Sequence, residues 1–286
     1  MFKKSLLVLA ILTILASLSC RGPNEEKYNV VSLRDGTVIS FAEMLEDVQR
    51  ADFIFVGETH DNMEHHQLQL KVIEGLHARN LPLAVGLEIF WAGNQPALNR
   101  WSTGKMDMED FIRLYYRNWG MPWPLYRDIL LYLKQEDIPL VGLNIPRSIT
   151  RKVAKSGASS LTVEELAQIP PGLSCDVSPA YRQYIQDIFT EHAGGEEKAF
   201  QNFCEAQILW DKAMAWHLVR YRKENPGIST VVLCGMVHAL KRGIPFRVKE
   251  MEKEKEYTSR IIVPQGPGIN LQSIGPSLAD YLVIVD

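Results

Sequence analysis

The sequence predicts an α/β fold: a mainly parallel central sheet with helices on both faces and a helical insertion. Short, almost entirely apolar runs alternate with longer segments of helical character. Such runs are typical of strands buried on both faces, as in parallel sheets covered by helices. A second observation is that residues 148–225 carry no strand pattern, which indicates a helical insertion. The apolar runs lie at 53–56, 83–90, 138–143 and 230–234.

The composition is that of a globular chain with ample material for a core. The 286 residues are 46% hydrophobic and 23% charged, which is ordinary for a folded protein. A net charge of -3 and an isoelectric point near 6.2 give no electrostatic reason to expect nucleic-acid binding. We expect residues 30–286 to form a single domain.

The first 29 residues are expected to lie outside this domain. Two lysines precede an apolar stretch at 6–18, which has the organisation of a secretory signal and is short for a bilayer span. Cys20 then stands where a bacterial lipoprotein is processed and lipidated. We predict a signal peptide over 1–20, a polar tether over 21–29, and an exported protein anchored by lipid to a bacterial membrane, facing the periplasm or the cell surface. Plain secretion with an incidental cysteine is the alternative.

The elements before the insertion follow from local signals. The turn pair Asp35-Gly36 predicts a hairpin of two short strands. Ser40 and Glu43 form the pattern of a capping box at the start of a helix. We expect helices at 41–50, 64–79 and 126–135, two helical pieces between 95 and 119 that are separated near 102–104, and strands at 53–56, 83–90 and 138–143. The histidines of the second helix, at 65, 66 and 77, are expected to be solvated or structural.

The insertion and the C-terminal part complete the sheet. Thr162 and Glu165 again form a capping-box pattern, and a long helix is expected at 196–223. Further elements are a strand at 230–234, a helix at 244–254 and strands at 260–263 and 281–285. The sequence leaves open whether Cys175 and Cys204 are bridged, although export permits disulfides.

Polar side chains stand where four of the predicted strands end. In open α/β sheets, ligands bind at the edge formed by the carboxyl ends of the strands. If the four strands are parallel neighbours, these side chains converge there. The aromatic and proline-rich segment 118–126 is either core packing or the apolar wall of a pocket at this edge. The polar residues are Glu58, His60, Glu88, Asn144, Arg147 and His238.

The residue types leave several chemistries open. Two imidazoles and two carboxylates can bind a divalent metal, perform general acid–base catalysis, or frame an organic ligand. The chain has no His-Glu-x-x-His motif, nucleophile elbow, Walker loop or dinucleotide fingerprint. The structural alternative is that each polar residue only caps its own loop.

Five short motifs stand out along the chain: Gly-Glu-Thr-His at 57–60, Gly-Leu-Glu-Ile-Phe at 86–90, Trp-Pro-x-Tyr at 123–126, Asn-Ile-Pro-Arg at 144–147 and Gly-Met-Val-His at 235–238. Together they resemble those of the ChaN-like family of haem-binding uptake proteins. That family resembles the wider Tiki/TraB group, in which two Gly-x-x-His motifs and a Glu recur, and it is similar in fold to erythromycin esterases. The likeness spans residue 30 to the C-terminus and is weakest in the insertion.

The resemblance implies a haem-binding lipoprotein in bacterial haem and iron uptake, with a protein side chain on the iron. Histidine and tyrosine both serve as haem ligands. Matching motifs carry the site over to His60 and His238, with Glu58 and Glu88 beside them. The candidate iron ligands are therefore His60, His238 and Tyr126, with Tyr115 and Tyr116 as weaker tyrosines. Arg147 or Arg127 would bind the porphyrin propionates.

The rival interpretation is a hydrolase of the Tiki or erythromycin-esterase type, either metal-dependent or based on His and Glu. His60 or His238 would then activate water, while Glu58 and Glu88 would orient it or hold a divalent metal. We take haem binding without an enzymatic activity as the leading interpretation. The sequence leaves open the iron ligand, the formation of a homodimer, and whether haem is stored, transferred or processed.

Overall fold

The computed structural model describes residues 28–173, 197–253, 255–266 and 274–285, together with positions 175, 177, 179, 181–183, 185, 186 and 189. The predicted signal peptide with Cys20, and most of the predicted tether, lie outside the described residues. Within them, no helix has the length and apolar character needed to cross a membrane.

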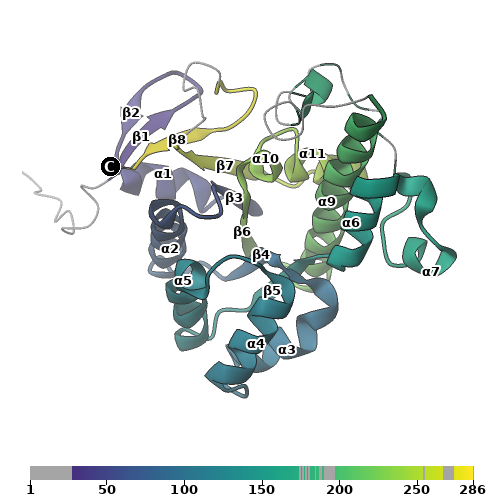
Figure 1. The fold of residues 1–286 in the computed structure, drawn as a ribbon. Helices are drawn as coiled ribbons and strands as arrows, with labels where there is room; N and C mark the ends of the chain where they lie inside the picture. The colour runs from purple at the N-terminus through teal and green to yellow at the C-terminus, as the bar shows by residue number, and fades with distance from the viewer. Residues whose placement is uncertain are drawn as a thin grey trace, which may run out of the picture.

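The described strands form one sheet of eight, in the order β2-β1-β8-β7-β3-β6-β4-β5 (Figure 1). All neighbours from β8 to β5 pair in parallel, and β1 pairs antiparallel with β2 and with β8. The prediction of a mainly parallel sheet is therefore confirmed. The strands are β1 (Asn29–Ser32), β2 (Val38–Ile39), β3 (Phe53–Glu58), β4 (Leu83–Trp91), β5 (Leu140–Asn144), β6 (Ser229–Gly235), β7 (Ser259–Pro264) and β8 (Tyr281–Ile284).

The helices lie close to where the sequence predicts them. Both capping boxes are present, at Ser40 with Glu43 and at Thr162 with Glu165. Before the insertion lie α1 (Phe41–Val48), α2 (Met63–His77), α3 (Gln95–Ser102), α4 (Met108–Asn118) and α5 (Trp123–Gln135). After them come α6 (Arg147–Ser156), α7 (Val163–Leu166), α9 (Glu197–Glu224), α10 (Met236–Ala239) and α11 (Ile244–Met251).

Two details differ from the sequence prediction. Helix α5 begins at Trp123 and not at Tyr126, because Pro124 occupies its first turn, where a missing N–H costs nothing. Helix α10 was not predicted, since four residues are too few to show a helical period. The second difference places His238 on a short helix directly after β6.

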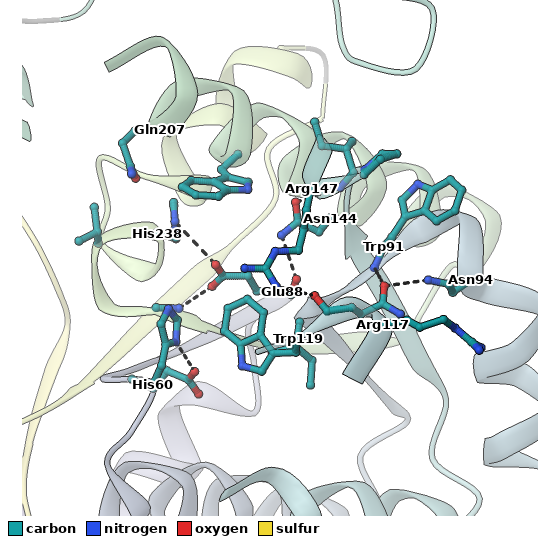
Figure 2. Close-up of a pocket in the computed structure, with 18 of the residues that line it drawn as sticks. His60, Glu88, Trp91, Asn94, Arg117, Trp119, Asn144, Arg147, Gln207 and His238 are labelled. Carbon is teal, nitrogen blue, oxygen red and sulfur yellow. Dashed lines mark hydrogen bonds and ion pairs between the residues drawn. The ribbon is translucent and has the colours of Figure 1, made fainter. Parts of the chain in front are cut away.

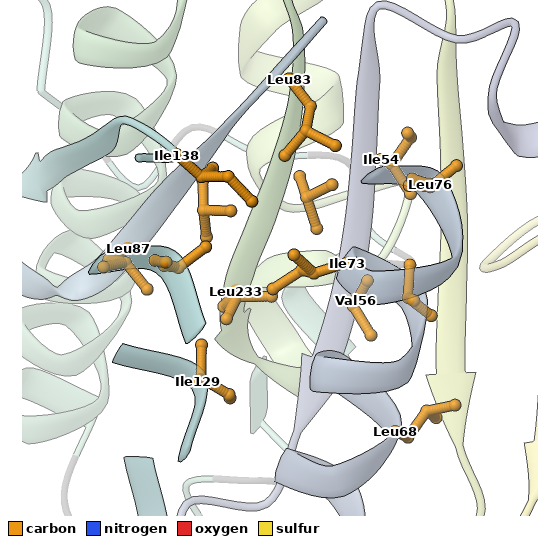
Figure 3. Close-up of a cluster of buried hydrophobic side chains, with 14 of the residues drawn as sticks. Ile54, Val56, Leu68, Ile73, Leu76, Leu83, Leu87, Ile129, Ile138 and Leu233 are labelled. Carbon is orange, nitrogen blue, oxygen red and sulfur yellow. The ribbon is translucent and has the colours of Figure 1, made fainter. Parts of the chain in front are cut away.

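Strand β3 is buried on both faces and separates two apolar cores. Ile54 and Val56 point into the core under α2, which Figure 3 shows from the side of that helix. Phe53 and Phe55 point to the opposite face, where they share a core with Leu218 of α9. Burying a side chain of this size stabilises the fold by about 1.5–3 kcal/mol. Residues 53–56 are all apolar because both faces of β3 are buried.

The insertion forms a helical layer beside the sheet. Ile149 and Val153 of α6 pack against Leu209 of α9 in a core of their own. Cys175 and Cys204 form a disulfide, so the pairing that the sequence left open is present, and the bond joins Cys175 to α9. Helix α9 also lies against β5 and α11 (Figure 1), so the insertion can contribute side chains to the carboxyl edge of the sheet.

Candidate functional site

A cavity of about 850 Å³ opens at the carboxyl ends of β3, β6, β4 and β5. These four strands are neighbours in the sheet, so the polar groups that follow them meet at one edge, as the sequence predicted. All six polar residues that the sequence analysis singled out line the cavity, five of them at or after a strand end and Glu88 three residues before the end of β4: Glu58, His60, Glu88, Asn144, Arg147 and His238. Most of them are labelled in Figure 2.

Other walls of the cavity come from residues that the sequence did not single out. Gln207 and Trp210 of α9 cover one side, and Arg117 stands at the end of α4. Trp119, from the aromatic segment 118–126, also lines the cavity, so part of that segment is a pocket wall. The ring of Trp119 meets the ring of His60 edge-on, with centroids 4.9 Å apart.

His60 and Glu58 form a carboxylate–imidazole pair at the end of β3. Nδ1 of His60 lies 2.8 Å from Oε1 of Glu58. Because that carboxylate is an acceptor, we assign the proton to Nδ1, which leaves Nε2 to point into the cavity (Figure 2). The side chain of His60 is 32% exposed, whereas that of Glu58 is 2% exposed. His60 therefore offers an oriented ring nitrogen to a ligand in the cavity.

Glu58 is surrounded by donors, which keep this buried carboxyl ionised. Burial alone would raise the pKa of Glu58, but the hydrogen bond from His60, the contact with His66 and the positive charge of both rings hold it well below its usual range. For His60 itself, burial opposes the charged form, while Glu58 and Glu88 outweigh it and raise the pKa.

His66 is a cation in this network. Its Nδ1 lies 3.2 Å from both Glu58 Oε2 and Gln69 Oε1, and its Nε2 lies 3.1 Å from the carbonyl oxygen of His60. Gln69 uses its amide nitrogen to donate to Val56, so its oxygen must accept. Every group that faces the ring is thus an acceptor. His66 makes an ion pair with Glu58, while its directed hydrogen bond goes to Gln69.

Tyr126, one of the candidate iron ligands predicted from the sequence, does not line the cavity in this structure. Its side chain is 1% exposed, it is absent from the cavity wall, and its hydroxyl donates to Glu58 Oε1. Burial and the charge of Glu58 raise the pKa of Tyr126 far above its ordinary value, so a phenolate is strongly disfavoured here. The sequence could not place this side chain, because a tyrosine after a rigid aromatic loop can face either side of its helix.

The two weaker tyrosines also stand outside the cavity wall. Tyr115 is buried and donates to the carbonyl of Met121. Tyr116 is 53% exposed, and its hydroxyl accepts from the backbone of Trp123. Neither hydroxyl is directed at His60 in this structure.

His238 is held by a second set of carboxylates. Its Nδ1 lies 2.7 Å from Asp211 Oδ1, and its Nε2 lies 3.8 Å from Glu88 Oε1. Tyr181 donates to the other oxygen of Asp211 at 2.6 Å. Burial opposes the charged form of His238, but Glu88 and Asp211 outweigh it and raise its pKa to about 9. His238 is therefore an imidazolium at neutral pH, with both ring nitrogens facing acceptors.

Glu88 and Asn144 are tied to the ends of neighbouring strands. Oε2 of Glu88 accepts from the backbone N–H of Gly235 at 2.7 Å. The partner of this buried carboxylate is thus a backbone amide, with His238 nearby. The side-chain amide of Asn144 donates to the backbone carbonyl of Glu88 at 3.0 Å, which holds the ends of β4 and β5 together.

The mouth of the cavity carries positive charge. Arg117 and Arg147 both line it and are exposed. The guanidinium of Arg147 lies 6.0 Å from the ring centroid of Trp119. Arg127, the other cation that the sequence offered, lies on the exposed face of α5 outside the cavity wall. Of the two candidates, only Arg147 can meet a ligand in this cavity.

The site thus combines an inner end of carboxylate–imidazole pairs with a cationic mouth. It holds an oriented imidazole nitrogen, on His60, and a buried imidazolium, His238, in one cavity, which suits ligation or acid–base work. Across the described residues, no three His, Cys, Asp or Glu side chains are arranged to hold a metal ion. The divalent-metal site that the sequence allowed is therefore not found there.

The sequence did not reveal the buried partners of His60 and His238. His66, a partner of Glu58, and the neighbouring His65 were expected to be solvated or structural, and both are buried and structural. Nδ1 of His65 accepts from the backbone N–H of Thr59 at 2.9 Å. Asp211 was missed because one acid in a long helix carries no local signal of burial. The one sequence signal that Asp211 is buried is its spacing: it falls on the same helical face as the buried Met214 and Leu218.

Comparison with known proteins points to one family. A family model described as "Haem-binding uptake, Tiki superfamily, ChaN" matches residues 44–248. The solved structure of ChaN from Campylobacter jejuni, described as binding haem cofacially, has a TM-score of 0.72 at 19% identity and covers 91% of this chain and 97% of that one. A mutant of the erythromycin esterase EreC in its open conformation has a TM-score of 0.50 at 16% identity, covering 90% of this chain and 82% of that one.

A curated plant protein is also similar. RETICULATA-RELATED 5 of Arabidopsis thaliana, a chloroplastic protein, is 20% identical over 255 residues, which is 83% of this chain and 34% of that protein. The chain therefore spans about a third of that relative's length. At these identities, the two solved structures establish the fold.

The high pKa of His238 predicts a loss of stability at alkaline pH. Since the pKa is about 9 in the folded chain against 6.5 for the free group, the stabilisation is complete below pH 6.5 and disappears as the pH rises to about 9. The loss is on the order of 3 kcal/mol, because each pH unit between the two pKa values corresponds to about 1.4 kcal/mol. Urea unfolding between pH 6 and pH 9.5 measures it. His238→Asn should make the alkaline loss smaller, leaving the part that comes from His60 and His66, whose pKa values are also raised. His77→Asn should leave the profile unchanged, and equal slopes in wild type and His238→Asn would contradict the assignment.

Proposed function

The chain belongs to the ChaN family of haem-binding uptake proteins in the Tiki superfamily, whose model covers residues 44–248, and from this premise we propose that it binds haem in the cavity and serves bacterial haem and iron uptake. One observation carries the proposal. Nε2 of His60 points into a cavity of about 850 Å³, while a buried carboxylate fixes the other ring nitrogen. Cavities of about 300–1,000 Å³ are typical of cofactor sites.

His60 is the proposed iron ligand. Proteins prepare a ligating imidazole by giving its second nitrogen a carboxylate partner, which fixes the tautomer and raises the basicity of the ligand. His60 has such a partner and an accessible nitrogen. His238 is 6% exposed, and both of its nitrogens face carboxylates, so it supports the inner wall and does not bind the iron.

The remaining walls suit a flat, apolar ring with acidic substituents. Trp119 and Trp210 contribute aromatic surface, and Ile89 and Met236 contribute aliphatic surface. Arg147 binds the porphyrin propionates, and Arg117 adds a second exposed cation to the cavity wall, because guanidinium and carboxylate form strong charge-assisted hydrogen bonds. The charge layout therefore orients haem with its propionates outward.

A lipid anchor on Cys20 would hold this pocket at a membrane surface. The support is the sequence alone: two lysines, an apolar stretch at 6–18 and a cysteine directly after it. Residues 21–29 would connect the anchor to the first strand. The protein would then serve uptake from the periplasmic side or the cell surface.

A hydrolase is the second candidate, favoured by one specific observation. The Glu58–His60 pair and the Asp211–His238 pair are both at the inner end of the cavity, one with an accessible nitrogen and one protonated. A base and an acid in one cavity can hydrolyse an ester without a metal.

Ferric haem titrated into the full-length chain in detergent should give a saturable shift of the Soret band and quench tryptophan fluorescence. His60→Ala should weaken binding at least about a hundredfold, beyond the 10–100-fold cost typical of losing a residue that only supports a ligand. His77→Ala, a partly buried histidine at the far end of α2, is the matched control. Absence of a saturable shift in the wild type contradicts haem binding. Ester hydrolysis that disappears in His60→Ala would then favour the hydrolase.

Reversing the charge at the mouth should weaken haem binding without removing the iron ligand. Arg147→Glu should raise the Kd for haem about tenfold, corresponding to about 1.4 kcal/mol, because a cation is replaced by an anion beside the propionates. Arg127→Glu changes the same charge on the exposed face of α5 and should have no effect. The measurement is the same absorbance titration, and equal Kd values for the two variants would exclude Arg147 from the propionate site.

Replacing the lipidated residue should release the protein from the membrane. Cys20→Ser removes the thiol that accepts the lipid, so a lipoprotein in a bacterial host should move from the membrane fraction to the soluble exported fraction. Cys234→Ser changes a buried free cysteine and should leave the distribution unaltered. Unchanged membrane association of Cys20→Ser would show that lipid on this residue is not the anchor.

A further inference from the structure

We propose that a second, smaller cavity along α9 binds a small oxyanion, a carboxylate or a phosphate, between His217, Arg220 and Asn99. The inference is independent of haem binding, because none of the described residues lines both cavities. The second cavity has a volume of about 310 Å³, which suits a small molecule and is much less than the volume of the first. It lies between the C-terminal half of α9, helix α3, strand β5 and the turn that follows β4.

One face of α9 serves both cavities. Trp210 lines the large cavity, and His217 lines the small one seven residues later. Seven residues make almost two helical turns, so the two side chains lie on the same face, roughly 10 Å apart along the helix axis. Three further residues of that face also line the small cavity, namely Arg220, Tyr221 and Glu224. The long helix of the insertion therefore builds a second concave surface beyond the first.

His217 is a buried histidine without a partner in the chain. It is 8% exposed, and neither ring nitrogen has a hydrogen bond with the described residues. Nδ1 is sealed from solvent, which leaves Nε2 to face the cavity. Burial and the nearby charge of Arg220 lower the pKa of His217 to about 4, so the ring is neutral at neutral pH, and we assign its proton to Nε2. An apolar residue would fill this place without the cost of an unpartnered polar ring.

Asn99 directs its amide NH₂ group outward. The side-chain oxygen of Gln95 accepts from the backbone N–H of Gly142 at 3.0 Å, and its nitrogen donates to the backbone carbonyl of Leu140 at 2.7 Å. These two backbone groups of β5 determine which end of Gln95 is nitrogen. The same nitrogen donates to Oδ1 of Asn99 at 2.8 Å, so Asn99 presents its oxygen to Gln95. Its two N–H groups are therefore left to donate to a ligand in the cavity.

Arg220 supplies a positive charge beside these donors. Its Nε lies 3.8 Å from Oε1 of Glu224, which is an ion pair without a directed hydrogen bond. The planar guanidinium can therefore bind two oxygens of a carboxylate or a phosphate. Glu224 is the one carboxylate among the described residues that line this cavity. Because Glu224 is exposed, water and salt screen its repulsion of an anion.

This set of groups matches an acceptor. The ring N–H of His217, the amide of Asn99 and the guanidinium of Arg220 all donate, whereas the oxygens of a carboxylate or a phosphate accept. A metal cation is disfavoured here, because Arg220 would repel it. Binding of an oxyanion gives His217 the partner that it lacks within the chain.

The test is a calorimetric titration of the full-length chain in detergent, with inorganic phosphate and acetate as separate probes and chloride as the only other anion. At least one probe should bind saturably. Arg220→Gln should raise its Kd about tenfold, because the positive charge is lost. His217→Phe should raise it at least as much, because a ring of similar size has lost its donor. Arg151→Gln changes an exposed arginine of α6 outside both cavity walls and should bind like the wild type.

Weaker binding of one probe in both Arg220→Gln and His217→Phe supports the inference, and the probe that binds distinguishes a phosphate from a carboxylate. If His217→Phe fails to fold, Asn99→Ala at an exposed position takes its place with the same expected direction. An effect of Arg220→Gln alone overturns the inference, because an exposed charge would then attract any anion. Binding that is lost in Arg147→Gln but kept in His217→Phe also overturns it, since the anion would lie in the large cavity. The absence of saturable binding of both probes overturns it as well, and haem binding stands in each case.

Discussion

The site depends on a carboxylate that is buried at the end of the central strand. Glu58 is 3% exposed, and an ionised carboxyl at that depth persists only when donors compensate its lost hydration. His60, His66 and Tyr126 supply that compensation from the following loop, from α2 and from α5. The contacts to Glu58 therefore hold three separate segments of the chain together beside the cavity, and the contact from His60 orients its ring.

The same principle operates at the other side of the cavity. His238 stands between Asp211 and Glu88, and Asp211 comes from α9 of the insertion. The insertion is thus part of the site, since it supplies the acid that keeps His238 charged and the ring of Trp210 against it. Negative and positive groups alternate at the inner end, while Arg117 and Arg147 make the mouth cationic. This distribution suits a ligand with a metal inside and carboxylates outside.

Much of this arrangement could be predicted from the sequence, because strand ends in a parallel sheet share one edge. Glu58 and His238 follow apolar runs and Glu88 is the one charge near the end of another, and that local signal was enough to bring them together. The partners could not be predicted, because they lie on helices whose facing side depends on packing. Tyr126 was assigned to the cavity for this reason, although it lies behind Glu58. The contact of Asp211 with His238 could not be predicted for the same reason, because Asp211 lies on helix α9.

The account claims that His60 Nε2 is the iron ligand and that Glu58 orients it. A crystal structure of the haem complex tests this most directly, because it locates the iron, both ring nitrogens and the carboxylate together. We expect the iron at bonding distance from Nε2 of His60, with Nδ1 still on Glu58 and the propionates toward Arg147. Iron on a tyrosine oxygen or on His238, or a haem outside this cavity, would contradict it.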